Sequence, residues 1–193
     1  KIQIKLKILL IDNFDSFTYN IVHYLEGFGA EVSVVFNNEI PFDLVDTYDK
    51  IVLSPGPGLP IDAGDMSKLI EQYFDKKPIL GVCLGFQALV EFFDGTIFNQ
   101  EEVKHGITEN CFFDSKSKLF DKTPKEYKVG LYHSWAADKK TFPEELKITA
   151  KSEFDIIMAF EHRELPICGV QFHPESIMTE NGRQIIKNFL VNF

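Results

Sequence analysis

A cysteine between two glycines is the feature of this sequence that most directly suggests chemistry. Residues 81–85 read Gly-Val-Cys-Leu-Gly and overlap an apolar run at 79–82. Flanking glycines allow close backbone approach at a sharp turn from a strand into a helix, and such a turn exposes the side chain between them. In hydrolases this turn is the nucleophile elbow, here with a thiol in place of the serine hydroxyl. We therefore predict that Cys83 is a nucleophile.

A second segment, far along the chain, supplies a base and an acid. His173 and Glu175 are separated by a single proline. In an extended segment, residues i and i+2 point to the same side, so Glu175 is predicted to orient the imidazole of His173. An imidazole beside a thiol can take its proton or stabilise the thiolate, and the start of the helix after Cys83 favours the thiolate as well. The sequence thus predicts a triad of Cys83, His173 and Glu175.

A proline- and glycine-rich segment is predicted to complete the site. Residues 54–60 read Ser-Pro-Gly-Pro-Gly-Leu-Pro. A loop in which proline fixes φ and glycine leaves it free can aim a backbone N–H at a developing oxyanion. The N–H of Leu84, directly after the nucleophile, is the natural second donor. Attack on an amide carbonyl would then give a thioester and release an amine, and water would hydrolyse the thioester.

The other cysteines and two of the other histidines do not lie in motifs of this kind. A lone cysteine is more often a small core residue than a nucleophile, and we interpret Cys111 and Cys168 in this way. His23 and His162 are likewise interpreted as structural or exposed histidines. The sequence shows no glycine-rich phosphate motif and no cluster with metal-ligand spacing, so we expect neither a cofactor nor a metal.

Composition limits the class of protein. The 193 residues suit one domain spanning 1–193, and 45% apolar residues with 19 phenylalanines can build its core. A formal net charge of −9 argues against a nucleic-acid surface. No apolar run approaches the roughly 18 residues of a membrane span, and no signal-peptide pattern opens the sequence. Three cysteines without Cys-x-x-Cys spacing favour free thiols, so we expect a cytoplasmic protein.

The first half of the chain alternates strand and helix patterns. Strands are predicted at residues 5–11, 32–36, 51–53 and 79–82, and helices at 17–28, 66–74 and 86–93. This alternation predicts an α/β fold with an open, mostly parallel, mixed sheet and helices on both faces. The pattern weakens after residue 95, where only shorter strands are predicted, at 103–107, 128–132, 147–150 and 156–160. A clearer strand at 167–172 leads to His173, and a helix at 185–190 closes the chain.

Together these motifs resemble the class I (triad) glutamine amidotransferases. The resemblance rests on residues 81–87, Gly-Val-Cys-Leu-Gly-Phe-Gln, and residues 169–175, Gly-Val-Gln-Phe-His-Pro-Glu. Residues 12–20, Asp-Asn-Phe-Asp-Ser-Phe-Thr-Tyr-Asn, and 132–135, Tyr-His-Ser-Trp, narrow it to subunits that serve chorismate-using synthases. The resemblance covers essentially the whole chain and implies a flavodoxin-like fold.

The resemblance also implies a role for each site residue. Cys83 would be the nucleophile, His173 the base and Glu175 its orienting partner. The backbone N–H groups of Gly56 and Leu84 would form the oxyanion hole. The residues that would hold L-glutamine are Gly56, Pro57, Gly58, Gln87, Ser134 and Trp135. In the family, ammonia passes to a separate synthase subunit that binds chorismate, and a water-excluding interface protects it from protonation.

Three positions depart from the family pattern. Phe86 stands where histidine is common, Leu131 where arginine is frequent, and Ile107 where lysine is common. None of these positions belongs to the triad. Residues 12–16 and 104–108 are our candidate contacts with the partner.

Several functions remain open at this point. The leading hypothesis is a glutaminase subunit of anthranilate synthase, in tryptophan biosynthesis. The nearest alternative changes the partner to aminodeoxychorismate synthase, in folate biosynthesis. A self-sufficient cysteine hydrolase and a non-catalytic scaffold are the other two, although a scaffold would be expected to lack part of the triad.

Overall fold

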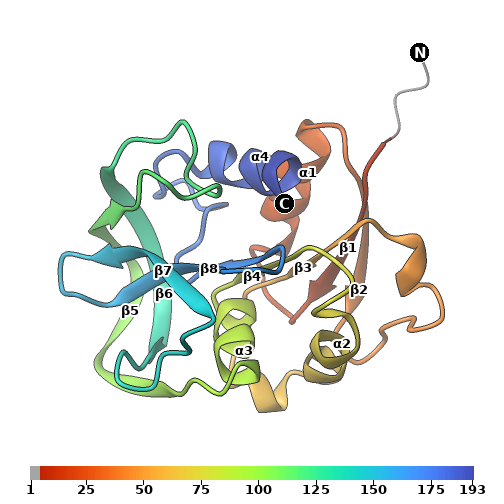
Figure 1. Ribbon diagram of the computed structural model, residues 1–193, viewed down its shortest axis with the longest axis horizontal. Helices are drawn as coiled ribbons and strands as arrows, with labels where there is room; N and C mark the ends of the chain where they lie inside the picture. Colours follow the sequence, from red (N-terminus) through yellow and green to blue (C-terminus); the bar gives the residue numbers. More distant parts are fainter. Residues whose placement is uncertain (1–4) are drawn as a thin grey trace.

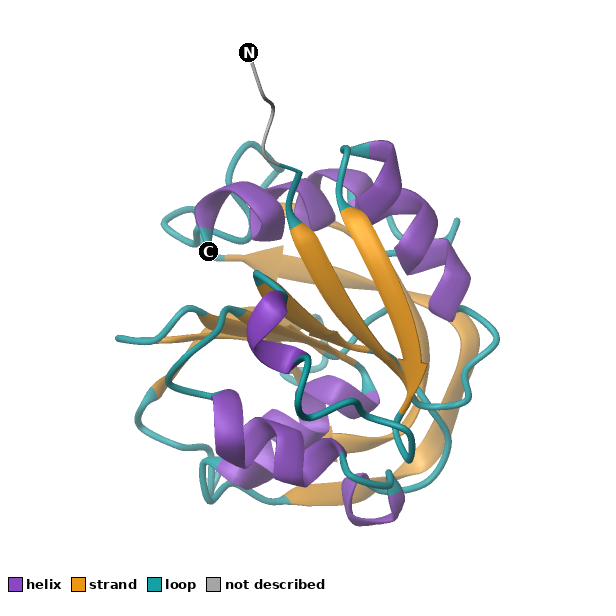
Figure 2. Ribbon diagram, turned by 90° about the vertical axis from the view of Figure 1, so that its right-hand side faces the viewer, coloured by secondary structure: helices purple, strands orange, loops and turns teal. Residues whose placement is uncertain are grey.

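The computed structural model describes residues 5–193, which form one mixed sheet with helices on two sides (Figures 1 and 2). The strands are β1 (Lys7–Asp12), β2 (Glu31–Phe36), β3 (Lys50–Leu53), β4 (Ile79–Val82), β5 (Ile97–Phe113), β6 (Glu126–Ala137), β7 (Leu146–Ser152), β8 (Ile157–His162) and β9 (Ile167–Val170). The helices are α1 (Thr18–Gly27), α2 (Met66–Tyr73), α3 (Leu84–Phe92) and α4 (Gly182–Asn192), with short 3-10 turns η1 (Val45–Thr47) and η2 (Pro60–Asp62).

The sheet has a parallel half and an antiparallel half. Its strand order is β2-β1-β3-β4-β9-β8-β7-β5-β6. The first five strands in this order are parallel, which is the flavodoxin-like arrangement, and the remaining pairs are antiparallel. The predicted α/β class is therefore confirmed.

Strand alternation explains why helices cover both faces of the parallel half. In β1, Ile8 and Leu10 join the core under α1 and α4, whereas Leu9 and Ile11 join the core under α2 and α3. All four side chains are fully buried. Successive side chains of a strand point to opposite faces, so a strand that is buried on both faces is apolar throughout. Figure 1 shows the two helix pairs on opposite sides of the sheet.

The antiparallel half differs from the sequence prediction in its strand lengths. β5 runs for 17 residues and pairs with β6 through two register shifts, whereas we predicted a strand only at 103–107. None of residues 97–108 is buried. A strand exposed in this way carries little apolar periodicity, which is why most of it escaped prediction.

The strand that leads to His173 is shorter than predicted. β9 ends at Val170 rather than at residue 172, and the chain then turns at the carboxyl edge of the sheet. Ligand sites of open α/β sheets lie at this edge. Among residues 5–193, no helix has the length and apolar character that a membrane crossing requires.

Candidate active site

Cys83 lies at the turn between β4 and α3 in a backbone conformation that few L-residues adopt. Its φ is 53° and its ψ is −100°. Strain of this kind costs on the order of 1–3 kcal/mol and persists only where the surroundings enforce it. The Cys83 N–H donates to the carbonyl of Val170, at the end of the neighbouring strand β9, with an N···O distance of 2.8 Å. The elbow predicted from the sequence is present.

The two flanking glycines are required by contacts between backbones. A Cβ atom on Gly81 would lie 2.5 Å from the carbonyl oxygen of Gly85. A Cβ atom on Gly85 would lie 2.5 Å from the carbonyl oxygen of Leu53, in β3. Neither backbone can retreat without moving the sheet, so the glycines allow α3 to begin directly against β3 and β4.

His173 and Glu175 form a buried pair. Nδ1 of His173 donates to Oε1 of Glu175 at 2.6 Å, and both side chains are at most 3% exposed. The expectation of an extended segment is wrong, because the N–H of Ser176 donates to the carbonyl of His173 and closes a turn. Glu175 therefore reaches the imidazole from within a turn, and the predicted pairing forms by a different backbone path.

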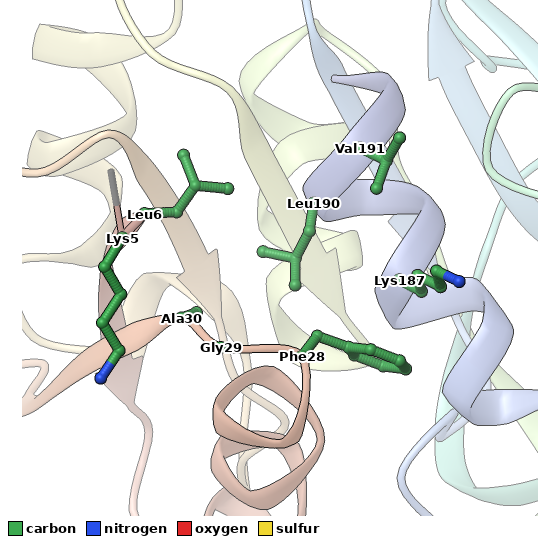
Figure 3. A pocket seen from close by; sticks show the side chains of 8 residues that line it. All are labelled: Lys5, Leu6, Phe28, Gly29, Ala30, Lys187, Leu190 and Val191. Carbon is green, nitrogen blue, oxygen red and sulfur yellow. The ribbon is translucent and has the colours of Figure 1, made fainter. Parts of the chain in front are cut away.

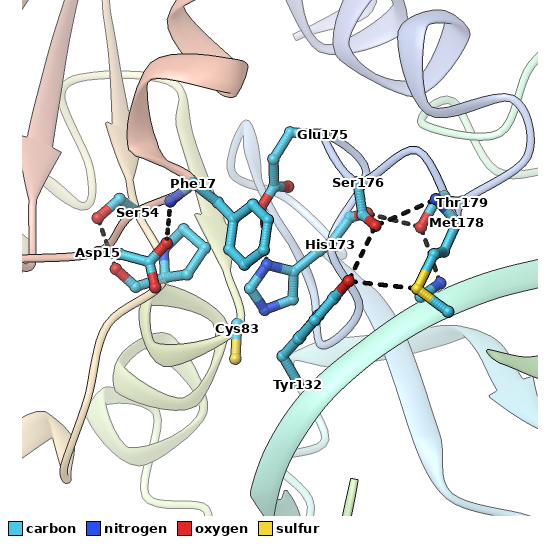
Figure 4. Close-up of polar contacts among 12 residues, drawn as sticks. Asp15, Phe17, Ser54, Cys83, Tyr132, His173, Glu175, Ser176, Met178 and Thr179 are labelled. Atoms are coloured by element: carbon cyan, nitrogen blue, oxygen red, sulfur yellow. Dashed lines mark hydrogen bonds and ion pairs between the residues drawn. The ribbon is translucent and has the colours of Figure 1, made fainter. Parts of the chain in front are cut away.

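Two opposing effects act on the charge of His173. Burial disfavours the imidazolium ion, but the nearby Cys83 sulfur and the hydrogen bond to Glu175 outweigh it and raise the pKa of His173 well above its ordinary value. The Cys83 sulfur favours the charged imidazole through both its charge and a hydrogen-bonding interaction, and Nε2 makes no other hydrogen bond within residues 5–193. Figure 4 shows Cys83, His173 and Glu175 gathered at one place.

Two aromatic rings enclose the imidazole, and sequence reasoning did not predict them. The ring of Tyr132 lies 5.0 Å from that of His173, and the ring of Phe17 lies 5.7 Å from it, centroid to centroid (Figure 4). The Tyr132 hydroxyl contacts Met178 Sδ at 3.2 Å. Both aromatic residues belong to the motifs at 12–20 and 132–135, and that was the available signal.

The turn that carries His173 and Glu175 makes hydrogen bonds and backbone contacts with the elements around it. The Thr179 hydroxyl donates to the carbonyl of His173 at 2.6 Å and accepts from the N–H of Gly130 at 2.9 Å. A Cβ atom on Gly182, the first residue of α4, would lie 1.8 Å from the carbonyl oxygen of Pro174. Helix α4 therefore begins in direct backbone contact with the turn that carries His173 and Glu175.

Gly56, which carries one of the two predicted oxyanion donors, packs closely against Asn13 and the side chain of Leu84. A Cβ atom on Gly56 would lie 3.0 Å from Leu84 Cδ2 and 2.5 Å from Asn13 Cβ, so only glycine allows this approach. Leu84 is the first residue of α3, where a backbone N–H has no partner within the helix. Gly56 therefore lies against the side chain of Leu84, the residue that carries the other proposed N–H donor.

Asn13 supports this loop, a role that sequence reasoning missed. Its side chain donates to the carbonyl of Ser54 at 2.8 Å, its backbone N–H donates to the Ser54 hydroxyl at 2.9 Å, and Asn37 donates to its Oδ1 at 3.0 Å. Asp12 and Asn13 are both buried. Of the predicted partner contact at 12–16, only residues 14–16 therefore reach the surface to any extent.

The residues expected to hold glutamine surround the elbow on two sides. Gln87, on α3, is buried and donates from Nε2 to the carbonyl of Trp135, on β6, at 3.0 Å. Ser134 and Trp135 are half-buried, whereas Pro57 and Gly58 lie exposed at the tip of their loop. The structure thus joins Gln87 to the backbone of β6 and leaves Pro57 and Gly58 at the rim.

Two of the three departures from the family pattern have simple packing explanations. Phe86 is fully buried and packs on Phe160, with ring centroids 5.3 Å apart. Leu131 is also fully buried. Ile107 remains partly exposed on β5. Two of the three substitutions therefore extend the core.

The three cysteines have different surroundings. All are free and buried. Burial raises the pKa of the Cys111 thiol to about 12, and it raises the pKa of Cys168 well above its ordinary value. These two residues are therefore inert core thiols, as we expected. Among the described residues, no group of three or more His, Cys, Asp or Glu side chains is arranged to hold a metal ion.

A separate pocket lies away from the elbow, between the end of α1 and α4 (Figure 3). It has a volume of about 430 Å³. Its lining is apolar apart from Lys5 and Lys187, and it contains none of the residues predicted for the site. Because none of the predicted site residues lines this pocket, we place the chemistry at the elbow.

Comparison with known proteins agrees with this geometry. The family model described as glutamine amidotransferase class-I matches residues 9–193. Anthranilate synthase component 2 of Azospirillum brasilense is 44% identical over 186 residues, which cover 95% of this chain and 94% of that protein. The aminodeoxychorismate/anthranilate synthase component 2 of Bacillus subtilis is 40% identical over 188 residues, 96% of each chain.

A solved structure extends the agreement to the fold. A Thermoplasma acidophilum protein described as a "putative gmp synthase subunit a protein" superimposes with a TM-score of 0.87 at 27% identity, over 97% of this chain and 94% of that one. The family model spans the whole of the region that contains the elbow and the buried His–Glu pair. On this evidence, the chain belongs to the class-I glutamine amidotransferase family.

Proposed function

We propose that this chain hydrolyses L-glutamine and delivers the ammonia to a chorismate-binding synthase subunit, as the glutaminase subunit of an anthranilate synthase in the cytoplasm. The observation that carries the proposal is the buried His173–Glu175 pair beside the strained Cys83. The name of the Azospirillum brasilense relative supports the choice of partner.

The arrangement supports a two-stage reaction. A Cys83 thiolate opposite a protonated His173 attacks the side-chain amide carbon, and the N–H groups of Gly56 and Leu84 stabilise the oxyanion. As the C–N bond breaks, His173 gives its proton to the departing nitrogen, and ammonia leaves with its electron pair. Neutral His173 then takes a proton from water, whose oxygen attacks the thioester carbon. Glutamate leaves, and the thiolate and the imidazolium are restored.

The surroundings of His173 support a role for the synthase subunit in shielding ammonia from water. Phe17, Tyr132 and Glu175 line a pocket of about 370 Å³ that is open to the surface, and Ile177 at its rim is fully exposed. Ammonia that takes a proton from water loses its nucleophilic electron pair, so exclusion of water around the site would favour its transfer. We infer that the synthase subunit covers this pocket and contacts residues 14–16 and 104–108.

The test of the function is a Cys83→Ser substitution assayed together with the synthase subunit. We expect glutamine-dependent synthesis to be lost, while an ammonium salt still supports synthesis. Cys168→Ser, which changes a buried thiol outside the site, is the matched control and should retain use of glutamine. Glutamine-dependent synthesis by the Cys83→Ser variant would overturn the proposal.

The partner could also be an aminodeoxychorismate synthase. The Bacillus subtilis relative favours this second candidate, because its name includes both synthases. The two candidates differ in the aromatic product made from chorismate and glutamine. Isolation of the complex from its native cell, followed by identification of that product, decides between them.

A further inference from the structure

One residue in the 169–175 motif has no role in the reaction described above. Gln171 is fully buried, and its backbone N–H donates to the carbonyl of Met158, in β8, at 2.8 Å. Its side chain lies between two site residues. Nε2 of Gln171 donates to Sγ of Cys83 at 3.5 Å, and Oε1 accepts from Nε2 of Gln87 at 3.1 Å.

The chemistry of the partners fixes the direction of this chain of hydrogen bonds. The carbonyl of Trp135 can only accept, so Gln87 must turn its NH₂ group toward it. The second hydrogen of that NH₂ group then faces Gln171, which must offer its oxygen. The NH₂ group of Gln171 is left to face Cys83, where a thiolate is an acceptor. Reversing either amide would oppose donor to donor or acceptor to acceptor.

This arrangement determines what the Cys83 sulfur contacts at rest. The sulfur accepts a hydrogen bond from Gln171, while Nε2 of His173 has no hydrogen-bond partner other than this sulfur among the described residues. An amide N–H can stabilise a thiolate and hold its direction without supplying a proton. Gln171 can therefore hold the sulfur in place without exchanging a proton with it.

The same arrangement determines what Gln87 can offer to a ligand. Both hydrogens of its NH₂ group are used, by Trp135 and by Gln171. Its Oε1 accepts no hydrogen bond from any group in the described part of the chain and is not among the buried, unpartnered atoms. Gln87 can thus present only an acceptor, which suits the N–H donors of an ammonium or amide group and repels a carboxylate.

We propose that Gln171 is a positioning residue, which holds the Cys83 sulfur through its N–H and orients the Gln87 amide so that it presents an acceptor to the N–H groups of the substrate. The identity of that substrate rests on the function proposed above. The hold on the sulfur does not, so the two can be tested separately.

Two nearly isosteric substitutions separate the two contacts. Gln171→Met removes both the donor to Cys83 and the acceptor for Gln87. Gln171→Glu keeps an oxygen acceptor for Gln87 and removes the N–H donor to Cys83. Cys168→Ala, a truncation of a buried side chain in β9, is the control for a general loss of packing.

The first measurement is the rate at which iodoacetamide alkylates Cys83, followed by mass spectrometry of the peptide that contains it. Loss of one hydrogen bond to an ionised acceptor should slow alkylation roughly tenfold in both Gln171 variants, and Cys168→Ala should match the wild type. This readout needs no glutaminase activity. Wild-type alkylation rates in both folded Gln171 variants would overturn the proposal, as would an equal slowing in Cys168→Ala.

The second measurement is glutaminase kinetics with the synthase subunit present. For Gln171→Met we expect KM for glutamine to rise roughly tenfold, because Gln87 loses its fixed orientation. For Gln171→Glu we expect KM to stay within about twofold of the wild type while kcat falls roughly tenfold. An unchanged KM in the methionine variant would refute the role in orienting Gln87. Absence of glutaminase activity in the wild type would instead refute the proposed function.

Discussion

His173 follows β9 in the parallel half of the sheet, and His133 lies in β6 of the antiparallel half. Both are almost completely buried. Burial lowers the pKa of His133 to about 4; its hydrogen bond to the Trp135 carbonyl opposes the shift, and the positive charges of His173 and Lys104 add to it. For His173 the same burial effect is outweighed by Cys83 and Glu175, and the pKa rises.

The two histidines show that burial does not determine charge in this protein. A negatively charged partner decides whether the pKa of the buried imidazole rises or falls. Of these two histidines, only His173 has such a partner. In the antiparallel half, His133 instead donates to a neutral group, the Trp135 carbonyl, which also accepts from Gln87.

The largest predicted effect concerns the backbone packing of the parallel half. Gly85→Ala would place a Cβ atom 2.5 Å from the Leu53 carbonyl oxygen, so we expect a loss of about 3 kcal/mol or more in the free energy of unfolding. Gly106→Ala in β5 is the control from the other half. Its φ is 67°, but its Cβ would meet only Tyr132, at 3.9 Å, so a cost of about 1–2 kcal/mol is expected. Urea unfolding of both variants measures the difference, and equal costs would remove the contrast between the halves.

A second prediction concerns acid. Because His133 is held neutral to about pH 4 when folded and titrates near 6.5 when unfolded, its stabilising contribution is present above pH 6.5 and is lost as the pH falls toward 4. The difference of 2.5 pH units corresponds to about 3 kcal/mol. His133→Asn should remove this part of the acid sensitivity, measured as the free energy of unfolding at pH 7 and pH 4.5. An unchanged difference between the two pH values would contradict the assignment.

His173 should give the opposite dependence on pH, with a smaller effect. Its raised pKa contributes stability that is fully present below pH 6.5 and is lost as the pH rises through the folded value. Glu175→Gln removes the charged partner, so we expect a loss of about 1–2 kcal/mol at pH 6 and a smaller loss at pH 9. Thermal unfolding at the two pH values measures this. A larger loss at pH 9 than at pH 6 would reverse the predicted sign.

The smallest effect is expected at a charged group on the surface. Asp155 contacts Lys139 and Lys151, whose hydrogen bonds lower its pKa to about 2, but its side chain is 58% exposed. Exposed ion pairs contribute little because water and salt screen them. Asp155→Asn should leave the unfolding temperature at pH 7 unchanged within error. A measurable drop would show that a strong pKa shift stabilises this protein even without burial.

The same division explains what could be predicted from the sequence. The parallel half was predictable because strands buried on both faces are apolar throughout and alternate with amphipathic helices. The turn at Cys83 and the pairing of His173 with Glu175 were predictable, because the glycines around Cys83 and the spacing of the other two residues are local signals. The full length of β5 was not, because an exposed strand has no apolar period. The contacts of Asn13 and Gln171 join residues distant in sequence, and such pairings leave no pattern along the chain.

Helix α4 is anchored at both of its ends. Gly182 begins it against the carbonyl of Pro174, and near its end Lys50 of β3 donates to the carbonyls of Phe189 and Phe193. The length of the helix therefore helps to fix the position of the turn that carries His173 and Glu175 relative to the sheet. Any insertion or deletion within it would shift His173 relative to Cys83, so variation in this helix should be confined to side chains on its outer surface.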